Sequence, residues 1–412
     1  MTERTVVITG IGPVTPVGVG RGPFWEALTS GRSGIDEITL FDASEFPVRI
    51  AGEVKDFDPA EWMDRKAAKR TDRVVHLAVA AAKLAWEDAG RPAVDPERAA
   101  VVVSTGVGGL RYMEDQIRVL ATRGPGRVSA FTVPAMMPNA AAGTIAMELG
   151  FTGPNACITT ACAAGGHGIG EAYRYIKHGM SDVALAGGTE AAVTPLSVAA
   201  FAQMQALTRN PDPTKASRPF DAGRDGFVIS EAACVVLLEE KERALERGAT
   251  IYAEVAGYGT SADAFHITQP EPQGAGAVIA MQMGLADAGE PAEAVGYINA
   301  HGTSTPLNDA AETRAIKKAL GDHAYRVAVS STKSMTGHMV GAAGAAEAAV
   351  GALVVKEGVI PPTINYEDAD PECDLDYVPN ESREADVRLA LSNSFGFGGQ
   401  NAVLAIRDSA AG

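Results

Sequence analysis

The sequence predicts an α/β protein built from two similar halves. Short apolar runs alternate with helical stretches along the 412 residues, a pattern typical of strands connected by helices. Five elements then recur in the same order later in the chain, which indicates an internal repeat. We expect one half to span residues 1–250 and the other to span residues 251–412.

The individual elements follow from local patterns of apolar residues. Buried strands are expected at Val6–Ile8, Ala100–Val103, Val183–Ala186 and Cys234–Leu238, and helices at Val74–Ala89, Gly168–Lys177 and Ala342–Lys356. Their alternation favours a central sheet with mostly parallel strands.

The repeat consists of five matched pairs of segments. They are Val6–Gly12 with Glu254–Gly259, Asp88–Gly90 with Asp287–Gly289, Val101–Gly106 with Tyr297–Gly302, Thr159–Cys162 with Ser330–Lys333, and Val183–Gly188 plus Cys234–Leu238 with Leu389–Gly399 plus Ala402–Ile406. The first half also carries extra segments at about 20–70 and 110–150, which we expect to be functional or interfacial.

The composition narrows the class of protein. Hydrophobic residues make up 46% and charged residues 21% of the chain, as in ordinary globular domains. A net charge of −16 argues against nonspecific nucleic-acid binding. The four cysteines show no CxxC pairing, and we find no signal peptide and no apolar run of membrane length. We therefore expect a cytoplasmic location.

Cys162 is the first candidate for chemistry. Residues 157–166 read Cys-Ile-Thr-Thr-Ala-Cys-Ala-Ala-Gly-Gly, so a β-prone run stops at Cys162 and a helix of small residues follows. A thiol at a helix N-terminus favours the thiolate and is a candidate nucleophile for acyl transfer. The alternative for any single cysteine is inert packing, which we expect for Cys157 inside the strand run and for Cys234.

Three further side chains occupy turns that follow predicted strands. His301 lies in Asn-Ala-His-Gly-Thr-Ser-Thr, and Lys333 and His338 lie in Ser-Ser-Thr-Lys-Ser-Met-Thr-Gly-His. Because the second turn is the repeat partner of the cysteine turn, the repeat places Lys333 and His338 opposite Cys162. A thiol with two imidazoles predicts an acyl-transfer site.

The last motif is the Gly-rich segment Asn393–Asn401. Its glycines leave backbone amides free to serve as oxyanion donors. It runs into a strand rather than a helix, so it is no phosphate-binding loop. The seven histidines show no metal-ligand spacing, and we expect no metal and no cofactor.

Four segments together resemble the signature elements of the β-ketoacyl-acyl-carrier-protein synthases, and most closely the elongating, type II condensing enzymes of fatty acid synthesis. They are Thr160–Cys162, Asn299–Thr305, Lys333–His338 and Asn393–Gly399. The resemblance extends from Val6 to Leu404. It implies a thiolase-like fold, in which two pseudo-symmetric βαβαβ-type halves form a layered α/β/α/β/α body.

The resemblance also implies a mechanism. Cys162 would accept an acyl group as a thioester from acyl carrier protein (ACP). His301 and His338, as neutral imidazoles, would stabilise the enolate formed when malonyl-ACP loses carbon dioxide. The backbone amides of Cys162 and Phe397 would hold the tetrahedral oxyanion, a type of interaction that lowers the barrier where charge develops.

Supporting roles are implied by the resemblance alone. Lys333 would order the site through an ion pair with Glu347. The pantetheine arm would contact Thr303, Thr305, Thr268 and Phe397, and Phe397 would also act as a mobile gate.

The implied partners are ACP and a second chain. A basic run of Arg65, Lys66, Lys69, Arg70 and Arg73 would form one face of a helix and dock the acidic ACP; the alternative is a solvated helix surface. The family implies a homodimer, or a heterodimer with a chain-length factor.

One departure from the family pattern leaves a second function open. Ser230-Glu231-Ala232 stands where the elongating enzymes have Gly-Glu-Gly, which reduces backbone freedom. The alternative is therefore a ketosynthase subunit that makes a polyketide or polyene with a chain-length-factor partner. A degradative thiolase is disfavoured because Cys373 lies outside any Gly-rich motif. An inactive scaffold subunit is disfavoured because Cys162, His301 and His338 are all present.

Overall fold

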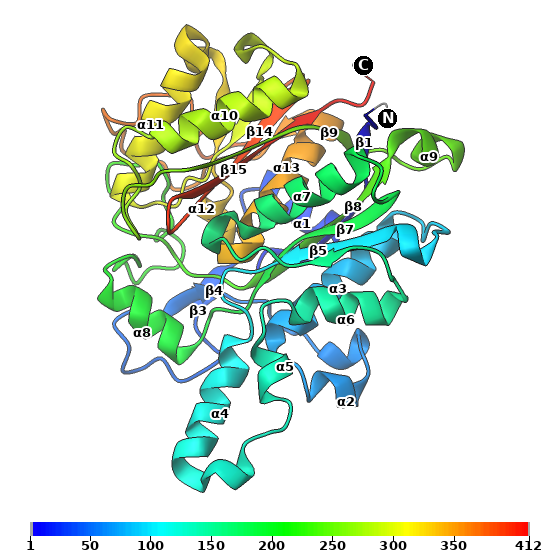
Figure 1. Cartoon of the computed structure of the whole chain (residues 1–412). Helices are drawn as coiled ribbons and strands as arrows, with labels where there is room; N and C mark the ends of the chain where they lie inside the picture. Colours follow the sequence, from blue (N-terminus) through cyan, green and yellow to red (C-terminus); the bar gives the residue numbers. More distant parts are fainter. Residues whose placement is uncertain (1–2, 411–412) are drawn as a thin grey trace.

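A single mixed sheet of 11 strands runs through the molecule, with helices on both sides and between its two parts (Figure 1). The computed structural model describes residues 3–410. Residues 1–2 of the predicted first half and residues 411–412 of the predicted second half therefore lie outside the described residues. The strands are β1 Val6–Thr15, β2 Gly18–Val19, β3 Ile35–Glu37, β4 Ile50–Gly52, β5 Ala99–Ser104, β6 Asn155–Ala156, β7 Val183–Glu190, β8 Ala232–Glu240, β9 Ala253–Ala262, β10 Tyr297–Asn299, β11 Ala328–Ser330, β12 Val359–Ile360, β13 Arg383–Glu384, β14 Leu389–Gly396 and β15 Gln400–Arg407. The helices are α1 Arg21–Thr29, α2 Arg65–Ala68, α3 Arg73–Asp88, α4 Leu110–Arg123, α5 Thr132–Met136, α6 Ala140–Leu149, α7 Ala164–Lys177, α8 Pro195–Gln203, α9 Lys241–Glu246, α10 Ala275–Ala288, α11 Pro306–Leu320, α12 Lys333–Thr336 and α13 Ala343–Glu357.

The strand order is nearly symmetric about the contact between β9 and β1. Across the sheet the order is β11-β10-β14-β15-β9-β1-β8-β7-β5-β6. The four middle strands, β15, β9, β1 and β8, pair antiparallel, and parallel pairs occur only toward the two ends. The prediction of mostly parallel central strands is therefore wrong. In the second half the reason is the short turn after Gly396, because such a turn can join only antiparallel neighbours.

The helices form three layers, which confirms the predicted layered thiolase-like body. Helices α7 and α13 are buried in the middle and contact strands from both parts of the sheet. Helices α3 and α6 cover the outside of the first part, and α10 and α11 cover the outside of the second. Figure 1 shows α10 and α11 on one side of the sheet and α3 and α6 on the other.

The glycines of the first repeat pair have the same structural cause in both halves. A Cβ on Gly12 would lie 2.0 Å from the carbonyl oxygen of Ala81 on α3, and a Cβ on Gly259 would lie 1.9 Å from that of Ala280 on α10. Each central strand therefore touches the backbone of its covering helix, which only glycine allows.

The fourth repeat pair is wrong in register. The cysteine turn leads through a 3-10 turn, Ala161–Ala163, into α7, and the matching 3-10 turn before α13 is Val340–Ala342. Ala161 and Val340, the first residues of these turns, both have positive φ, at 49° and 45°. Cys162 therefore corresponds to Gly341. The predicted partner, Ser330–Lys333, ends β11 and begins the additional helix α12.

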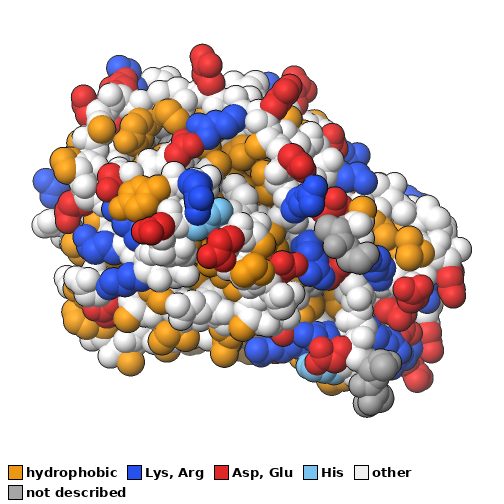
Figure 2. Space-filling model, turned by 90° about the horizontal axis from the view of Figure 1, so that it is seen from above, with side chains coloured by type: hydrophobic (Ala, Val, Ile, Leu, Met, Phe, Trp, Pro, Cys, Tyr) orange, Lys and Arg blue, Asp and Glu red, His pale blue; other side chains and the backbone are white. Residues whose placement is uncertain are grey.

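The two extra segments of the first half lie in different places: Ile35, Ile50 and Ala51 of residues 20–70 belong to a buried cluster that includes Cys162, whereas part of residues 110–150 lies at the periphery (Figure 1). Helices α4 and α5, from residues 110–150, project beyond the sheet (Figure 1). Exposed apolar side chains gather there, namely Ile117, Leu120, Phe131, Val133, Met136 and Met137. On the opposite end of the molecule acidic and basic side chains are interspersed with apolar ones (Figure 2). Among residues 3–410, no helix is both long and apolar enough to span a bilayer.

The close strand–helix contacts generate a prediction. We expect Gly12→Ala and Gly259→Ala each to lower the free energy of unfolding by about 1–3 kcal/mol, because the added methyl group overpacks a backbone contact. Urea denaturation measures the change. Gly143→Ala on α6 is the control, because a Cβ there meets no atom within 4 Å. Equal stability of Gly12→Ala and Gly143→Ala would contradict the packing argument.

Candidate active site

A cavity of about 540 Å³ opens between the two halves of the chain, and Cys162, His301 and His338 all line it. The wall also includes Thr268, Thr303, Thr305 and Phe397, for which the family resemblance implies contacts with pantetheine. The cavity thus brings together side chains from five separate loops and turns. Its apolar walls and few polar groups are typical of a small-molecule site.

Cys162 is held on a sharp turn at the start of α7. Ala161 before it has positive φ, and Cys162 is the second residue of the 3-10 turn that leads into the helix. The preceding strand β6 ends at Ala156. Cys157 therefore follows this strand instead of lying within it, contrary to the prediction, while Cys234 is buried within β8 as expected.

The thiol and the two imidazoles converge. His338 Nε2 lies 3.0 Å from Cys162 Sγ, and the rings of His301 and His338 are 5.4 Å apart at 85°. The sulfur and one nitrogen from each ring lie within 4.8 Å of one another. A proton can therefore pass between Cys162 and His338 directly, and both rings can approach one bound group.

Electrostatics at Cys162 differ from the sequence-based expectation. Burial raises the pKa of its thiol to about 12, although Lys333 and the backbone amide of Phe397 oppose the shift. Desolvation thus favours the protonated thiol, which is the direction opposite to the effect predicted for the helix N-terminus. The thiol keeps its proton until a base removes it.

Both histidines are neutral. Burial is the main cause that lowers the pKa of His301 and of His338 well below the usual range, and Lys333 lowers both further. A neutral imidazole has one nitrogen that donates a hydrogen bond and one that accepts. These rings can therefore donate to a developing oxyanion without carrying a charge of their own.

Lys333 is a buried cation with a buried partner. Its Nζ makes an ion pair and hydrogen bond with Glu347 Oε1, and both side chains are 1% exposed. Glu347 comes from α13, so the pair joins α12 to the central helix. Removing either partner would leave an uncompensated buried charge.

Sequence reasoning missed Glu312 on α11. Its carboxylate accepts hydrogen bonds from the backbone amides of His301 and Gly302, at 2.9 and 2.8 Å, and from Asn393 Nδ2 at 3.1 Å. It therefore anchors the histidine loop. A charged residue on the apolar face formed by Ala311, Ala315 and Ile316 is the signal that could have revealed it.

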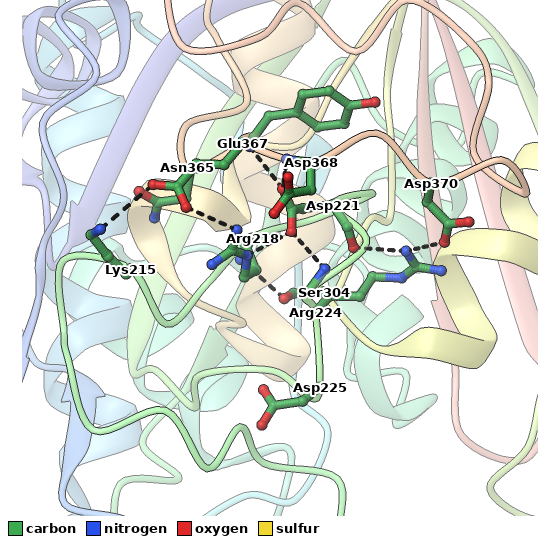
Figure 3. A network of polar contacts seen from close by, with 12 residues as sticks. Lys215, Arg218, Asp221, Arg224, Asp225, Ser304, Asn365, Glu367, Asp368 and Asp370 are labelled. Atoms are coloured by element: carbon green, nitrogen blue, oxygen red, sulfur yellow. Dashed lines mark hydrogen bonds and ion pairs between the residues drawn. The ribbon is translucent and has the colours of Figure 1, made fainter.

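A polar network holds the threonine segment in place (Figure 3). Ser304, which has φ 71°, accepts a hydrogen bond from the amide of Arg218 and another, at its carbonyl, from the amide of Gly226. Asp221 accepts from Arg218 Nε and from the amides of Glu367 and Asp368. The network connects residues 215–226 with 365–370 behind Thr303 and Thr305, whose hydroxyls are 2.9 Å apart.

Phe397 lies in the turn between β14 and β15. Its backbone amide points at Cys162 Sγ, which lowers the pKa of that thiol, and its ring lies 6.4 Å from the ring of Phe201. Gly396 before it allows close approach, because a Cβ there would lie 2.6 Å from the carbonyl oxygen of Thr160. The turn thus places an N–H donor beside the sulfur.

Among residues 3–410, the ligand atoms of Cys162, His301 and His338 form a group that could hold an ion, because they lie within 4.8 Å of one another. The prediction that the protein uses no metal stays a prediction.

The basic run does not form one helical face. Helix α2 covers only Arg65–Ala68, and Lys69 and Arg70 follow it in a turn. All four basic side chains, Arg65, Lys66, Lys69 and Arg70, are exposed. Arg73 belongs to α3 and points inward, where its guanidinium donates two hydrogen bonds to Glu231. The predicted patch therefore consists of four residues.

The Ser230 departure is accommodated beside His338. Ser230 Oγ donates to the carbonyl oxygen of Thr336 at 2.7 Å, and its amide donates to that of His338 at 3.0 Å. The hydroxyl lies 2.2 Å from where a Cβ on Gly52 or Gly337 would stand. Glycines opposite Ser230 thus provide the space that its side chain occupies.

Fold and site together define a thiolase-like condensing enzyme, in which a buried thiol faces two neutral imidazoles across a junction of two repeats. The chain belongs to the β-ketoacyl synthase family. Residues 3–244 match the family's N-terminal domain and residues 252–367 its C-terminal domain. The predicted resemblance is confirmed.

Individual relatives agree with this assignment. The 3-oxoacyl-[acyl-carrier-protein] synthase 2 of Synechocystis sp. is 52% identical over 410 residues, covering 99% of both chains. A solved type II polyketide ketosynthase, in complex with its acyl-carrier protein, has 34% identity and a TM-score of 0.92, covering 99% of this chain and 100% of that one. The ishigamide ketosynthase/chain length factor has 38% identity and a TM-score of 0.91, with the same coverage.

The Glu312 anchor generates a pH prediction. Burial raises the pKa of Glu312 from 4.5 to about 7, so its contribution to stability is full below about 4.5 and is lost as pH rises through about 7. Glu312→Gln cannot titrate. We expect the difference in melting temperature, wild type minus Glu312→Gln, to decrease as the pH is raised from about 5 to about 8. If differential scanning calorimetry gave parallel curves of melting temperature against pH for the two proteins, the raised pKa of Glu312 would be contradicted.

Proposed function

We propose that the protein elongates fatty acyl chains by two carbons as a β-ketoacyl-ACP synthase, with Cys162 as the acyl acceptor. The observation that carries this proposal is the convergence of one thiol and two neutral imidazoles at a single cavity. The reaction is a decarboxylative Claisen condensation of malonyl-ACP with the acyl group held on Cys162. Such chemistry needs a nucleophile and preorganised donors, and no redox group.

In the first step an acyl group moves from ACP to Cys162. His338 Nε2, 3.0 Å from the sulfur, takes the thiol proton as the sulfur attacks the thioester carbonyl. The amides of Cys162 and Phe397 hold the oxyanion. The tetrahedral intermediate then releases the ACP thiol, which takes up the proton, and a Cys162 thioester remains.

In the second step malonyl-ACP loses carbon dioxide. Negative charge develops on its thioester oxygen, where His301 donates a hydrogen bond and His338 donates one in the tautomer that carries its proton on Nε2. The resulting enolate carbon attacks the Cys162 thioester, so a carbon–carbon bond forms, the carbon–sulfur bond breaks and the Cys162 thiolate leaves. That thiolate takes a proton from solvent, and the product is a 3-oxoacyl-ACP two carbons longer.

The remaining cavity residues orient the substrates. Lys333, paired with Glu347, places a positive charge beside the reacting groups and adds to the burial that keeps both histidines neutral. Thr303, Thr305 and Thr268 offer hydroxyl groups along the cavity wall to the pantetheine arm. Phe397 gates access to the sulfur from the turn after β14.

ACP is the proposed partner, and it docks at Arg65, Lys66, Lys69 and Arg70. The patch is a cluster of exposed positive charge on a chain of net charge −16, which suits an acidic partner. The guanidinium of Arg70 lies 4.6 Å from the ring of Phe131. The patch therefore adjoins the exposed apolar side chains near α4 and α5.

Those apolar side chains support a homodimer. Four apolar side chains are exposed within one short segment, namely Phe131, Val133, Met136 and Met137. Clusters of this kind mark protein interfaces.

The second candidate function is that of a polyketide or polyene ketosynthase with a chain-length-factor partner. The similarity to the ishigamide ketosynthase/chain length factor favours it. We place the protein in the cytoplasm, where its four free cysteines stay reduced.

The two-step mechanism is tested by separating acylation from condensation. We expect Cys162→Ala to form no acyl-enzyme, and His338→Ala to retain some self-acylation while condensation falls about 100- to 1,000-fold. Intact-protein mass spectrometry with acyl-ACP measures the first step, and product mass with malonyl-ACP measures the second. Acylation of the Cys162→Ala protein would exclude Cys162 as the nucleophile.

The two candidate functions are distinguished by the requirement for a partner. Formation of product by this chain alone with saturated primers supports fatty acid synthesis, and a requirement for a second chain supports the polyketide function.

The docking patch is tested by charge reversal. We expect Arg65→Glu and Lys69→Glu to raise the KM for acyl-ACP about tenfold at low salt with little change in kcat, because charges at the rim of an interface act on association. Added salt reduces the difference from the wild type. Arg388→Glu, at an exposed position in the loop before β14, is the matched control. A KM increase of the same size in the Arg388→Glu control would contradict docking of ACP at the basic patch.

A further inference from the structure

The repeat gives the molecule a second junction built like the one that carries Cys162. In the first junction, the 3-10 turn Ala161–Ala163 contacts the end of β14 and leads into α7. In the second, the turn Val340–Ala342 contacts the end of β7 and leads into α13. Gly341 therefore takes the place of Cys162, and Glu190, the last residue of β7, takes the place of Gly396.

Glu190 fills this second junction with a carboxylate. The residue is fully buried. Its Oε1 accepts a hydrogen bond from Thr105 Oγ1 at 2.8 Å, and its Oε2 accepts from the amides of Gly106 at 2.7 Å and Gly341 at 3.2 Å. The amide of Gly341 corresponds to the amide of Cys162. In the second junction this amide donates to the Glu190 carboxylate, whereas in the first junction the Cys162 amide is available to donate to a substrate oxygen.

The surrounding backbone is shaped for this carboxylate. A Cβ on Gly106 would lie 2.7 Å from Glu190 Oε2, and a Cβ on Gly341 would lie 2.8 Å from the same atom. Val340 has φ 45°, which is strained for a β-branched residue. Such strain persists only where surrounding contacts hold it, and the Gly341 hydrogen bond acts on the next residue.

Glu190 thereby reaches the catalytic cavity from behind. Gly106, Val107 and Val340 all line the cavity, and Val340 lies against Gly106, where a Cβ would be 3.1 Å from Val340 Cγ1. Val340 follows His338 by two residues, and His338 contacts the Cys162 sulfur. We propose that Glu190 is a positioning residue that holds the Val340–Gly341 turn, and with it His338, against the Thr105–Val107 wall. This inference rests on the proposed function for its kinetic consequence.

The charge state of Glu190 supports this role. Burial raises the pKa of its carboxyl to about 7, and the donors at Thr105, Gly106 and Gly341 oppose the rise. The titratable groups that feel its charge are the thiols of Cys157 and Cys162, whose pKa values it raises. Protonation converts one acceptor into a donor. The hydrogen bonds to the two amides therefore weaken as pH falls through about 7.

The kinetic experiment compares Glu190→Gln with the wild type. We expect the kcat of condensation to fall about tenfold or more near pH 8, because small displacements of a catalytic group are costly, with the KM for acyl-ACP within about twofold. Near pH 6 the wild-type carboxyl is itself protonated, so the ratio of the two kcat values shrinks to about threefold or less. Equal kcat near pH 8, or a ratio independent of pH, would overturn the positioning role.

The matched control is Glu53→Gln. Glu53 is also a buried carboxylate that accepts from two backbone amides and a threonine hydroxyl, those of Thr39 and Leu40. None of these three residues lines the cavity. We expect this variant to keep the wild-type kcat and its pH dependence. A loss equal to that of Glu190→Gln would mean that any buried carboxylate has this effect.

A second measurement needs no activity. Hydrogen–deuterium exchange of the intact protein should show faster exchange in peptides covering Val340–Ala342 in Glu190→Gln, with peptides covering Ala161–Ala163 unchanged. Unchanged exchange in both would overturn the inference even if the wild type made no product, whereas an inactive wild type would count only against the proposed function. Thr105→Val, which removes one donor, should give the same changes at smaller size if Glu190→Gln does not fold.

Discussion

The close approach of α7 and α13 is the constraint on which the rest of the structure depends. A Cβ on Gly165 would lie 2.8 Å from the amide of Ala345, and a Cβ on Gly344 would lie 2.8 Å from that of Gly166. The two central helices therefore touch backbone to backbone between the parts of the sheet. This contact brings the turns at their N-termini together, so that Cys162 and His338, 176 residues apart, meet at 3.0 Å.

Burial of that meeting point sets its chemistry. Desolvation keeps the Cys162 thiol protonated and both imidazoles neutral, and it makes the Lys333–Glu347 pair necessary, because an unpaired charge there would be costly. Glu312 and Glu190 are carboxylates in the same dry interior, and each accepts backbone amides from a loop that lines the cavity. These buried charged groups thus either face the reacting groups or anchor the loops that carry them.

Most of the fold could be predicted because apolar runs and repeats are local patterns. The expected strands and helices are present with shifted ends, and Gly12 and Gly259 mark the repeat for a physical reason, the contact of each strand with its covering helix. Strand direction could not be predicted, because it depends on which strands become neighbours. The match of the cysteine turn to Ser330–Lys333 failed because α12 interrupts the second half, and no spacing rule anticipates an inserted helix.

The sequence by itself determined the reactive residue types, the two-fold repeat and the family, because these are written in short motifs and their order. Only the tertiary structure decided the protonation state of Cys162, the inward turn of Arg73 and the roles of Glu190 and Glu312. The reason is that burial, and the donors that reach a buried group, come from segments far apart in the chain. Local sequence indicates a helix N-terminus at Cys162, whereas burial at the junction of the two halves raises the pKa of its thiol.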